Sequence, residues 1–327
     1  MKVFAILIWA LLQISAGAAY AQSDSQGPVR IIVPFGPGGP SDATARVFAA
    51  ALSTEIGSTV IVENRPGGSG AIGALALLRA PANGLTLLLG SSSVLVTGSL
   101  VQEKNGQRLA YDPRKDIVPV GMMIATVPQV LLSRVTPEFK TLRELIMFGQ
   151  RNTGDLTYGT EGVGNITHLG MEMILDVAKV KAVHVPYPAG TPAKLRAVIS
   201  SDIDMGLAVL SNVYPFHKEG RVKIHAVAGP ERHPMIPDVP TLSEEGYPGI
   251  DITSWLGLFV RAGTPPDRFK FIADALRKAS ANPQLRESLQ AAGFVVRSPM
   301  TAAQEQKQYD AEFAKWAEIV KKVEVGK

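Results

Sequence analysis

The chain has 327 residues, of which 46% are apolar and 19% are charged, and it contains no cysteine. This is the composition of a globular protein of about two domains, and it excludes thiol chemistry and disulfide bonds. The formal net charge of +4 is too small to indicate a nucleic-acid partner, and no basic tract with interleaved aromatic residues occurs.

The first 21 residues have the pattern of a secretory signal peptide. Lys2 precedes the apolar run VFAILIWALLQI, and Ala19 and Ala21 form a small-x-small cleavage site. We therefore expect export to the periplasm with cleavage near Ala21, and an uncleaved membrane anchor is the alternative. A lipid anchor is excluded because it requires a cysteine. No later apolar run reaches membrane-spanning length.

The first half of the chain alternates strand-like and helix-like segments. The run VRIIVPF predicts a strand, and residues 41–56 predict a helix with Ser41 as its N-cap and Gly57 as its stop. Phe48 and Leu52 lie on one face of that helix. Further strands are expected at TVIVEN and LTLLLG, with a helix at ALALLRA between them. Strands that alternate with helices predict an α/β fold with a mostly parallel sheet flanked by helices.

The same alternation begins again in the second half. Strands are expected at QVLLSR, LTYGT, AVHVPY, DIDMGLAV and IHAVAG, and helices at TLRELIMFGQR, ITHLGMEMILDVA and AKLRAVIS. Thr191 and Pro192 form an N-cap and first-position proline pair for the last of these helices. A proline- and glycine-rich loop then leads to the strand SWLGLFV and to two final helices that end near residue 292.

A glycine motif between Gly68 and Gly73, GSGAIG, matches the dinucleotide fingerprint G-x-G-x-x-G. That site also requires an acidic residue about twenty positions later to bind the ribose hydroxyls. The chain has no Asp or Glu between Glu63 and Glu103. We therefore interpret the motif as a tight turn with close helix packing, and a dinucleotide-dependent enzyme is the alternative that it leaves.

The loop after the first strand, GPGGPSD, is a candidate anion site. Gly36, Gly38 and Gly39 allow the backbone to approach a ligand closely. The first-turn amides of the helix after Ser41 have no intrahelical acceptors and favour an anion. Asp42 must then point away from a bound carboxylate or organise the loop. Helix capping without a ligand is the alternative.

A second loop, Thr160–His168 (TEGVGNITH), has the same features in the second half of the chain. Asn165 is expected to cap the helix, Gly162 and Gly164 to open the backbone, and His168 to act as a neutral hydrogen-bonding group. A histidine on the helix surface is the alternative. Two such helix ends would suit a molecule with a carboxylate at one or both ends.

Catalytic and metal-binding patterns are missing from the sequence. It contains no H-E-x-x-H and no G-x-S-x-G motif, and its five histidines do not cluster. We therefore expect no enzyme activity, no metal and no cofactor. Ser91, Ser92 and Ser93 follow the third strand, where their hydroxyls can contact a ligand or cap a helix.

Seven segments, in this order, carry a resemblance to a known family: RIIVPFGPGGPSDATAR, VIVENRPGGSGAIG, YDPRKDIVPVGMM, LTYGTEGVGNITHLG, HVPYPAGTPA, PDVPTLSEEGYPG and SWLGLFVRAGTPP. Together they run from about residue 28 to residue 294. In these segments the chain resembles the solute receptors of tripartite tricarboxylate transporters, called Bug receptors.

The resemblance implies a two-lobed periplasmic-binding-protein (Venus flytrap) fold of the type II kind. The first lobe would comprise residues 28–127 and 254–327, and the second residues 128–253. A monomeric receptor would close over a small organic acid (di-, tri- or aromatic carboxylate) and deliver it to integral-membrane permease subunits. A sensing subunit that presents its closed form to a membrane kinase is the alternative.

The resemblance also implies the ligand-binding residues. They come from the first loop, the serines after the third strand, the second loop and the segment after DMGLAV: Phe35, Gly38, Gly39, Pro40, Ser41, Asp42, Ser91, Ser92, Ser93, Thr160, Gly162, Gly164, Asn165, His168 and Ser211. Glu161 departs from the family, which usually has a small residue there. Its carboxylate would repel a carboxylate ligand unless it is turned outward or paired.

Overall fold

The computed structural model describes residues 27–127, 129–187, 190–291, 293–298 and 300–323, so the expected signal peptide lies outside the described residues. The strands are β1 (Val29–Val33), β2 (Val60–Asn64), β3 (Thr86–Ser91), β4 (Ile117–Val127), β5 (Gln129–Arg134), β6 (Leu156–Thr160), β7 (Ala182–Pro186), β8 (Met205–Val209), β9 (Val222–Val227), β10 (Ser254–Arg261) and β11 (Val295–Val296).

The helices are α2 (Pro40–Ile56), α3 (Ala71–Arg79), α4 (Gly98–Lys104), α5 (Pro113–Asp116), α6 (Leu142–Arg151), α7 (Ile166–Ala178), α8 (Thr191–Ile199), α9 (Leu210–Lys218), α10 (Pro266–Ala281), α11 (Pro283–Ala291) and α12 (Ala302–Lys322). Three shorter turns complete them, the 3₁₀ turns η1 (Gly68–Gly70) and η3 (Pro137–Phe139) and the π-helical turn η2 (Ser92–Thr97). Within the described ranges, no helix combines the length and apolar character needed to cross a membrane.

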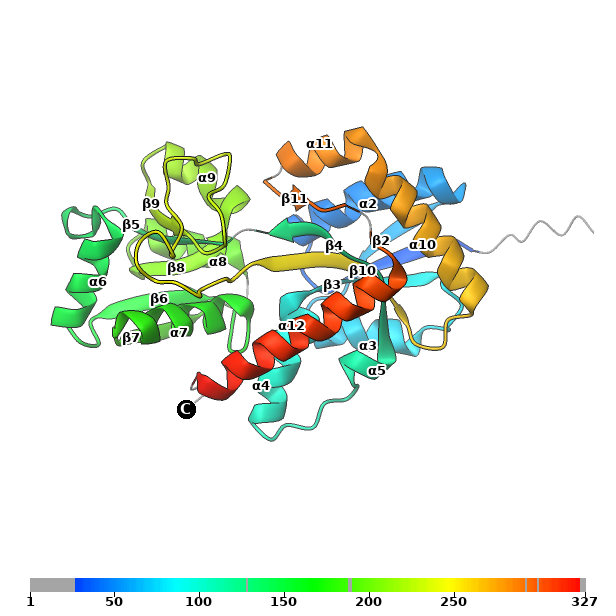
Figure 1. Ribbon diagram of the computed structural model, residues 1–327, viewed down its shortest axis with the longest axis horizontal. Helices are drawn as coiled ribbons and strands as arrows, with labels where there is room; N and C mark the ends of the chain where they lie inside the picture. Colours follow the sequence, from blue (N-terminus) through cyan, green and yellow to red (C-terminus); the bar gives the residue numbers. More distant parts are fainter. Residues whose placement is uncertain (1–26, 128, 188–189, 292, 299, 324–327) are drawn as a thin grey trace, which may run out of the picture.

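Two sheets form the centres of two lobes, which lie side by side in Figure 1. The first sheet has six strands in the order β11-β4-β10-β3-β1-β2, and the second has five in the order β7-β6-β8-β5-β9. The lobe boundaries proposed from the sequence, after residue 127 and before residue 254, fall between the strands of the two sheets.

Both sheets are mixed, with more antiparallel pairing than the sequence predicted. β1 pairs in parallel with β2 and β3, and β6 with β7 and β8, but β10 is antiparallel to β3 and β4, and β5 is antiparallel to β8 and β9. β5 and β10 are the strands by which the chain enters one lobe from the other. They therefore run against the strands that crossover helices connect within a lobe.

Helices cover both faces of each sheet, and the apolar core continues from one lobe into the other. Leu95 and Val101 of the first lobe belong to the same buried cluster as Ile166 and Leu169 of the second. A Cβ atom placed on Gly164 would lie 3.1 Å from the Val101 side chain, and Gly164 has φ of +80°, so glycine suits this close approach of the lobes.

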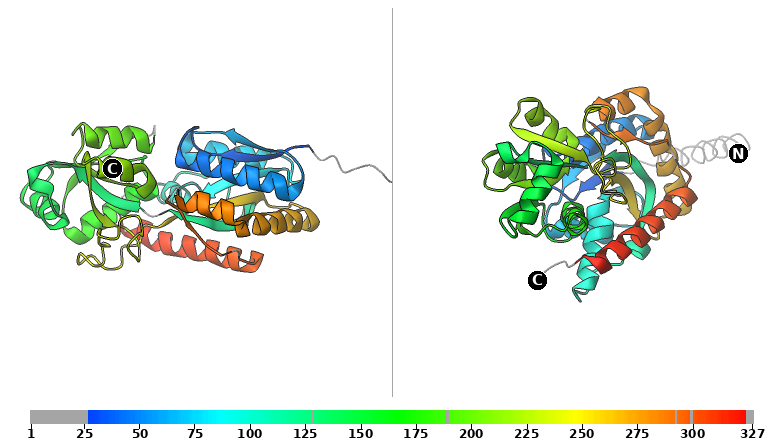
Figure 2. Two further views of the ribbon diagram at one scale, coloured as in Figure 1. Left: turned by 90° about the horizontal axis from the view of Figure 1, so that it is seen from above. Right: turned by 60° about the vertical axis from the view of Figure 1, so that its left-hand side comes forward.

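The last helix, α12, was missed by the sequence prediction, which ended the helical region near residue 292. It runs from the first lobe toward the second (Figure 1 and Figure 2). Tyr309, Phe313, Trp316 and Val320 are buried along one face of this helix. Their spacing of four, three and four residues is the helical signal that could have identified it.

Candidate ligand-binding site

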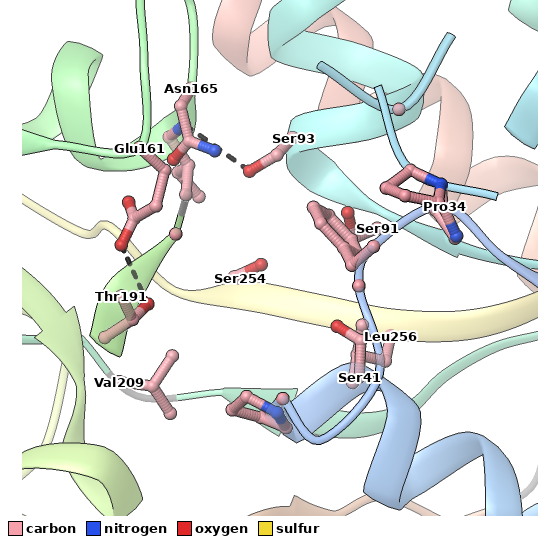
Figure 3. A pocket seen from close by; sticks show the side chains of 18 of the residues that line it. Pro34, Ser41, Ser91, Ser93, Glu161, Asn165, Thr191, Val209, Ser254 and Leu256 are labelled. Carbon is pink, nitrogen blue, oxygen red and sulfur yellow. Dashed lines mark hydrogen bonds between the residues drawn. The ribbon is translucent and has the colours of Figure 1, made fainter. Parts of the chain in front are cut away.

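A cavity of about 430 Å³ lies between the lobes, and residues of both lobes line it (Figure 3). The first lobe contributes the loop between β1 and α2, the glycine turn after β2 and the end of β3, together with Ser254, Leu256 and Phe294. From the second lobe come Gln129, Glu161, residues 165–167, residues 190–192 and Val209. This volume lies in the range of small-molecule pockets, about 300–1,000 Å³.

The start of α2 borders the cavity with unpaired backbone donors. Gly39 is the N-cap and Pro40 the first helical residue, so the prediction of Ser41 as the N-cap is wrong by two positions. No side chain caps this helix, and among the described residues the N–H groups of Ser41 and Asp42 have no backbone acceptor. Such amides, at the positive end of a helix dipole, favour a bound anion.

Asp42 is turned into the first lobe and organises the loop. Its carboxylate accepts hydrogen bonds from the Gly38 N–H, the Arg46 guanidinium and the Asn64 side-chain amide, each at 3.0 Å. Burial raises the pKa of Asp42, but these donors outweigh burial and place the pKa below its ordinary value. The negative charge of Asp42 is therefore neutralised away from the cavity. This is the arrangement expected from the sequence if Asp42 organises the loop and does not face a bound carboxylate.

The serines after β3 divide into two that face the cavity and one that does not. Ser91 Oγ accepts from the Val94 N–H at 3.3 Å, and Ser93 Oγ accepts from the Ile166 N–H of the second lobe at 3.4 Å. Ser92 is fully buried and accepts from the Trp255 N–H at 3.2 Å. Because the oxygen is the acceptor in each case, the Ser91 and Ser93 O–H groups remain available to donate to a ligand.

The second loop differs from the first, because the protein's own groups already accept its backbone donors. The Ile166 N–H bonds to Ser93 and the Thr167 N–H to Asn165 Oδ1 at 3.0 Å. The Gly164 N–H bonds to His168 Nδ1 at 3.3 Å. Asn165 is the N-cap of α7, as predicted. The N–H groups of Gly164, Ile166 and Thr167 in the expected second cluster are therefore already paired within the protein.

His168 lies inside the second lobe instead of on the helix surface. Its side chain is 4% exposed, and its ring stacks on that of His184 with centroids 4.2 Å apart. Burial, and to a smaller extent His184, lowers the pKa of His168 to about 4. The imidazole is therefore neutral near pH 7, and its Nδ1 holds the loop from behind the cavity wall.

The predicted site residues fall into two groups. Those that line the cavity are Phe35, Gly38, Gly39, Pro40, Ser41, Ser91, Ser93 and Asn165. Those that do not line it are Asp42, Ser92, Thr160, Gly162, Gly164, His168 and Ser211. Ser211 lies against Gly293 of the first lobe, whose added Cβ would be 3.3 Å from the Ser211 Cβ.

Glu161, which the sequence presented as an obstacle to anion binding, lines the cavity and is paired. Its carboxylate accepts from Lys194 Nζ, from Thr191 Oγ1 at 2.8 Å and from Thr167 Oγ1. Lys194 is 1% exposed. Burial raises the pKa of Glu161, but Lys194 and the two hydroxyls outweigh burial, so the pKa is lowered and the carboxylate is ionised. The sequence did contain a signal for this ion pair, because Lys194 lies on the buried face of the predicted helix AKLRAVIS.

Gln129, Thr191 and Ser254 also line the cavity and were not predicted. Gln129 is the first residue of β5 and is 3% exposed, and its Oε1 has no donor among the described residues. Gln129 and Ser254 begin strands, and Thr191 begins α8, whose N-cap is Gly190 and not Thr191 as predicted. Polar residues at such starts carry no local sequence signal for ligand contact, so these positions required the lobe arrangement. No group of three or more potential metal ligands occurs within the described ranges.

The GSGAIG segment packs as the sequence interpretation predicted. A Cβ atom on Gly73 would lie 2.9 Å from the Pro34 Cα, so this glycine allows α3 to approach the first loop closely. Gly67, Gly68 and Gly70 have φ values of 120°, 57° and 95°, which glycine adopts readily, and they line the cavity. The tight turn thus supports the cavity wall opposite the second lobe.

Comparison with known protein sequences identifies a family. Residues 44–325 match the family described as "Tripartite tricarboxylate transporter family receptor". The chain is 32% identical to a protein encoded in the tcbD-tcbE intergenic region of Pseudomonas sp. (strain P51), over 90% of this chain and 85% of that protein. It is 30% identical to BugT of Bordetella pertussis, over 90% of this chain and 88% of BugT.

Solved structures give the same result. MatC from Rhodopseudomonas palustris with bound malate is 29% identical, with a TM-score of 0.80 over 90% of this chain and 98% of that chain. Rpa4515 of R. palustris with adipate is 27% identical, with a TM-score of 0.82 over 91% of this chain and 98% of that chain. The periplasmic binding protein BugD is 28% identical, with a TM-score of 0.80 over 90% and 97% of the two chains. These similarities confirm the two-lobed periplasmic-binding-protein fold.

Proposed function

Because the chain belongs to the receptor family of tripartite tricarboxylate transporters, we propose that it binds a small organic acid between its lobes and delivers it to the permease subunits of such a transporter. The family consists of solute-binding receptors of the periplasm and not of enzymes, so the prediction of a non-enzymatic protein is confirmed. The expected resemblance to Bug receptors is confirmed as well.

The observation that carries the proposal is the unpaired start of α2 at the cavity. The N–H groups of Ser41 and Asp42 have no acceptor among the described residues, and the Asp42 carboxylate, which does not line the cavity, is neutralised by donors of the first lobe. The hydroxyls of Ser91 and Ser93 lie on the same wall. A ligand carboxylate at this position would receive several hydrogen bonds without a charged side chain.

The relatives with known ligands support an acid of this size. MatC binds malate and Rpa4515 binds adipate, and both are small dicarboxylates. Because residues of both lobes line the cavity, we further propose a monomeric receptor in which ligand contacts from both lobes stabilise a closed form over an open one. A permease that recognises only the closed form would then receive loaded receptor.

Titration calorimetry of the mature protein with mono-, di-, hydroxy- and aromatic carboxylates tests the proposal. We expect at least one acid to bind with a dissociation constant on the order of micromolar, about −8 kcal/mol. At a hundredfold excess over that constant, the ligand should add about 2.7 kcal/mol to the free energy of unfolding. If no acid of any class binds, the proposed function is wrong.

Delivery needs a second measurement. Vesicles that carry the permease subunits of a tripartite tricarboxylate transporter should take up the labelled acid only when the receptor is added. Loaded receptor that binds a membrane sensor kinase and does not stimulate uptake would assign the chain to sensing.

A further inference from the structure

The two walls of the cavity have opposite hydrogen-bonding character. Figure 3 shows Glu161 and Thr191 on one side and Ser41 and Ser91 on the other. The first-lobe wall offers N–H and O–H donors, as described above. On the second-lobe wall the most prominent polar group is the Glu161 carboxylate, whose side chain is 17% exposed. A symmetric dicarboxylate would place one of its charges against this carboxylate.

The Glu161 carboxylate has acceptor capacity left over. A carboxylate offers about four lone-pair sites. Lys194 and Thr191 donate to Oε1, whereas Oε2 receives only the Thr167 hydroxyl. Oε2 can therefore accept one further hydrogen bond, and none of the described residues donates it.

Gln129 lies on the same wall but does not compete with Glu161 for a donor. The residue is 3% exposed and lines the cavity, and its Oε1 is enclosed by protein with no donor among the described residues. An enclosed acceptor without a donor costs about 1–3 kcal/mol, and a ligand in the cavity does not reach it in this arrangement. Of these two second-lobe acceptors, Glu161 is therefore the one open to the cavity.

We propose, on the basis of the proposed function, that the ligand has a carboxylate at the α2 end and a neutral hydroxyl at the end that meets Glu161. The hydroxyl donates to Glu161 Oε2. In this assignment the protein is a receptor for hydroxy monocarboxylates, and a second carboxylate at the distal end is selected against.

The Lys194 ammonium decides between a neutral and a cationic donor. Lys194 is buried behind Glu161 and also donates to the Leu207 carbonyl, so the charge of Glu161 is already balanced within the lobe. An ammonium group on the ligand would add an uncompensated positive charge beside this pair and would lose its hydration. A hydroxyl gains the hydrogen bond without that cost.

Matched ligands test the assignment in titration calorimetry. For chain lengths of four to six carbons, the ω-hydroxy acid, the dicarboxylate, the ω-amino acid and the unsubstituted monocarboxylate are compared on the wild-type protein. The best ω-hydroxy acid should bind about tenfold more tightly than each matched acid, which corresponds to one good hydrogen bond. Tightest binding of a dicarboxylate, an amino acid or an unsubstituted acid would overturn the assignment but leave the proposed function standing. Failure of all of these acids and of the wider panel would reject the proposed function itself.

A double variant gives the second test. Glu161→Gln together with Lys194→Met removes both charges and introduces an amide that can donate to a carboxylate. We expect the preference for the hydroxy acid over the dicarboxylate to fall from about tenfold to less than about threefold. The control is Arg134→Met with Asp204→Asn, which removes a partly buried ion pair of the same lobe away from the cavity. An unchanged preference in the first double variant, or an equal loss in the control, would contradict the role of Glu161.

Discussion

The two strand-to-helix loops at the cavity have similar sequences and different chemistry. Both are rich in glycine and open a helix. Within the part of the chain that the structure describes, the first leaves the amides of Ser41 and Asp42 unpaired, whereas Ser93 and Asn165 accept hydrogen bonds from the second. In place of free amides, the second lobe presents the Glu161 carboxylate, balanced by Lys194. Glycine-rich helix starts therefore indicate backbone freedom, and neighbouring side chains decide whether that freedom serves a ligand.

The largest effect should come from separating Glu161 from its cation. Lys194→Met retains the apolar stem but leaves a largely buried carboxylate without a cation, held only by the Thr167 and Thr191 hydroxyls, which should lower the free energy of unfolding by about 3 kcal/mol. Urea denaturation provides the measurement. Lys179→Met is the control, because its pair with Asp176 has side chains 77% and 79% exposed and should change stability by less than about 1 kcal/mol. Equal losses in both variants would show that the Glu161 pair is not structurally special.

Acid should disrupt the second loop before the first. The pKa of His168 is lowered to about 4 in the folded protein and is about 6.5 when unfolded. Above pH 6.5 the imidazole is neutral in both states, and the free energy of unfolding has its full value. As the pH falls from 6.5 toward 4, only the unfolded chain is protonated, so the free energy of unfolding falls by up to about 1.4 kcal/mol per pH unit.

Asp42 is the corresponding group of the first loop. Its pKa is lowered in the folded protein, so the ionised carboxylate stabilises the fold fully above about pH 3.9, the unfolded value. This contribution to the free energy of unfolding is lost only at lower pH. Amide exchange followed by NMR should therefore show loss of Gly164 protection between pH 6.5 and 4 with the Gly38 amide still protected. Simultaneous loss would mean that the loops do not respond separately.

Gly38→Val tests the first loop directly. Gly38 has φ of +79°, where a β-branched residue costs about 1–3 kcal/mol, so the loop should move and ligand binding should weaken by tenfold or more. Gly57→Val is the matched control, since Gly57 also has a positive φ of +69° and open space but ends α2 away from the cavity. Both variants should lower the melting temperature similarly, and only Gly38→Val should weaken binding in calorimetry.

The smallest effect should come from removing the hydrogen bond between the lobes, from the Ile166 N–H to Ser93 Oγ. Ser93→Ala removes the acceptor of the Ile166 N–H and should disfavour the closed form by about 1 kcal/mol. Fluorescence energy transfer between labels on the two lobes would report the change. Ser92→Ala, whose hydroxyl accepts from Trp255 within the first lobe, should leave the closed fraction unchanged. A closed fraction that falls in both variants would assign the effect to general destabilisation.

Local patterns were sufficient for most of the fold. The helix α7 and its Asn165 cap follow the predicted bounds, because capping and apolar periodicity act within a few residues. The same reasoning misplaced the cap of α2, where Gly39 and Pro40 begin the helix before Ser41. The direction of β10 was also not predicted, since it depends on the crossing between lobes.

The site was less predictable because its hydrogen bonds are long-range. Ser93 and Ile166 are 73 residues apart in sequence, and Glu161 and Lys194 are 33 apart. The loop sequence showed where backbone amides gather. It contained no information on the serine of the other lobe that accepts one of them, because that contact depends on how the lobes meet.

The pairing of β4 with β10 has a consequence for how the cavity opens. The chain leaves the first lobe along β4 and returns along β10, and Val127 and Ser254 lie opposite each other at the boundary. Two hydrogen-bonded strands resist sliding along their length but bend and twist readily. The lobes should therefore rotate relative to each other about this two-stranded hinge. The length of a molecule held between the lobes would then set the angle between the lobes in the bound state.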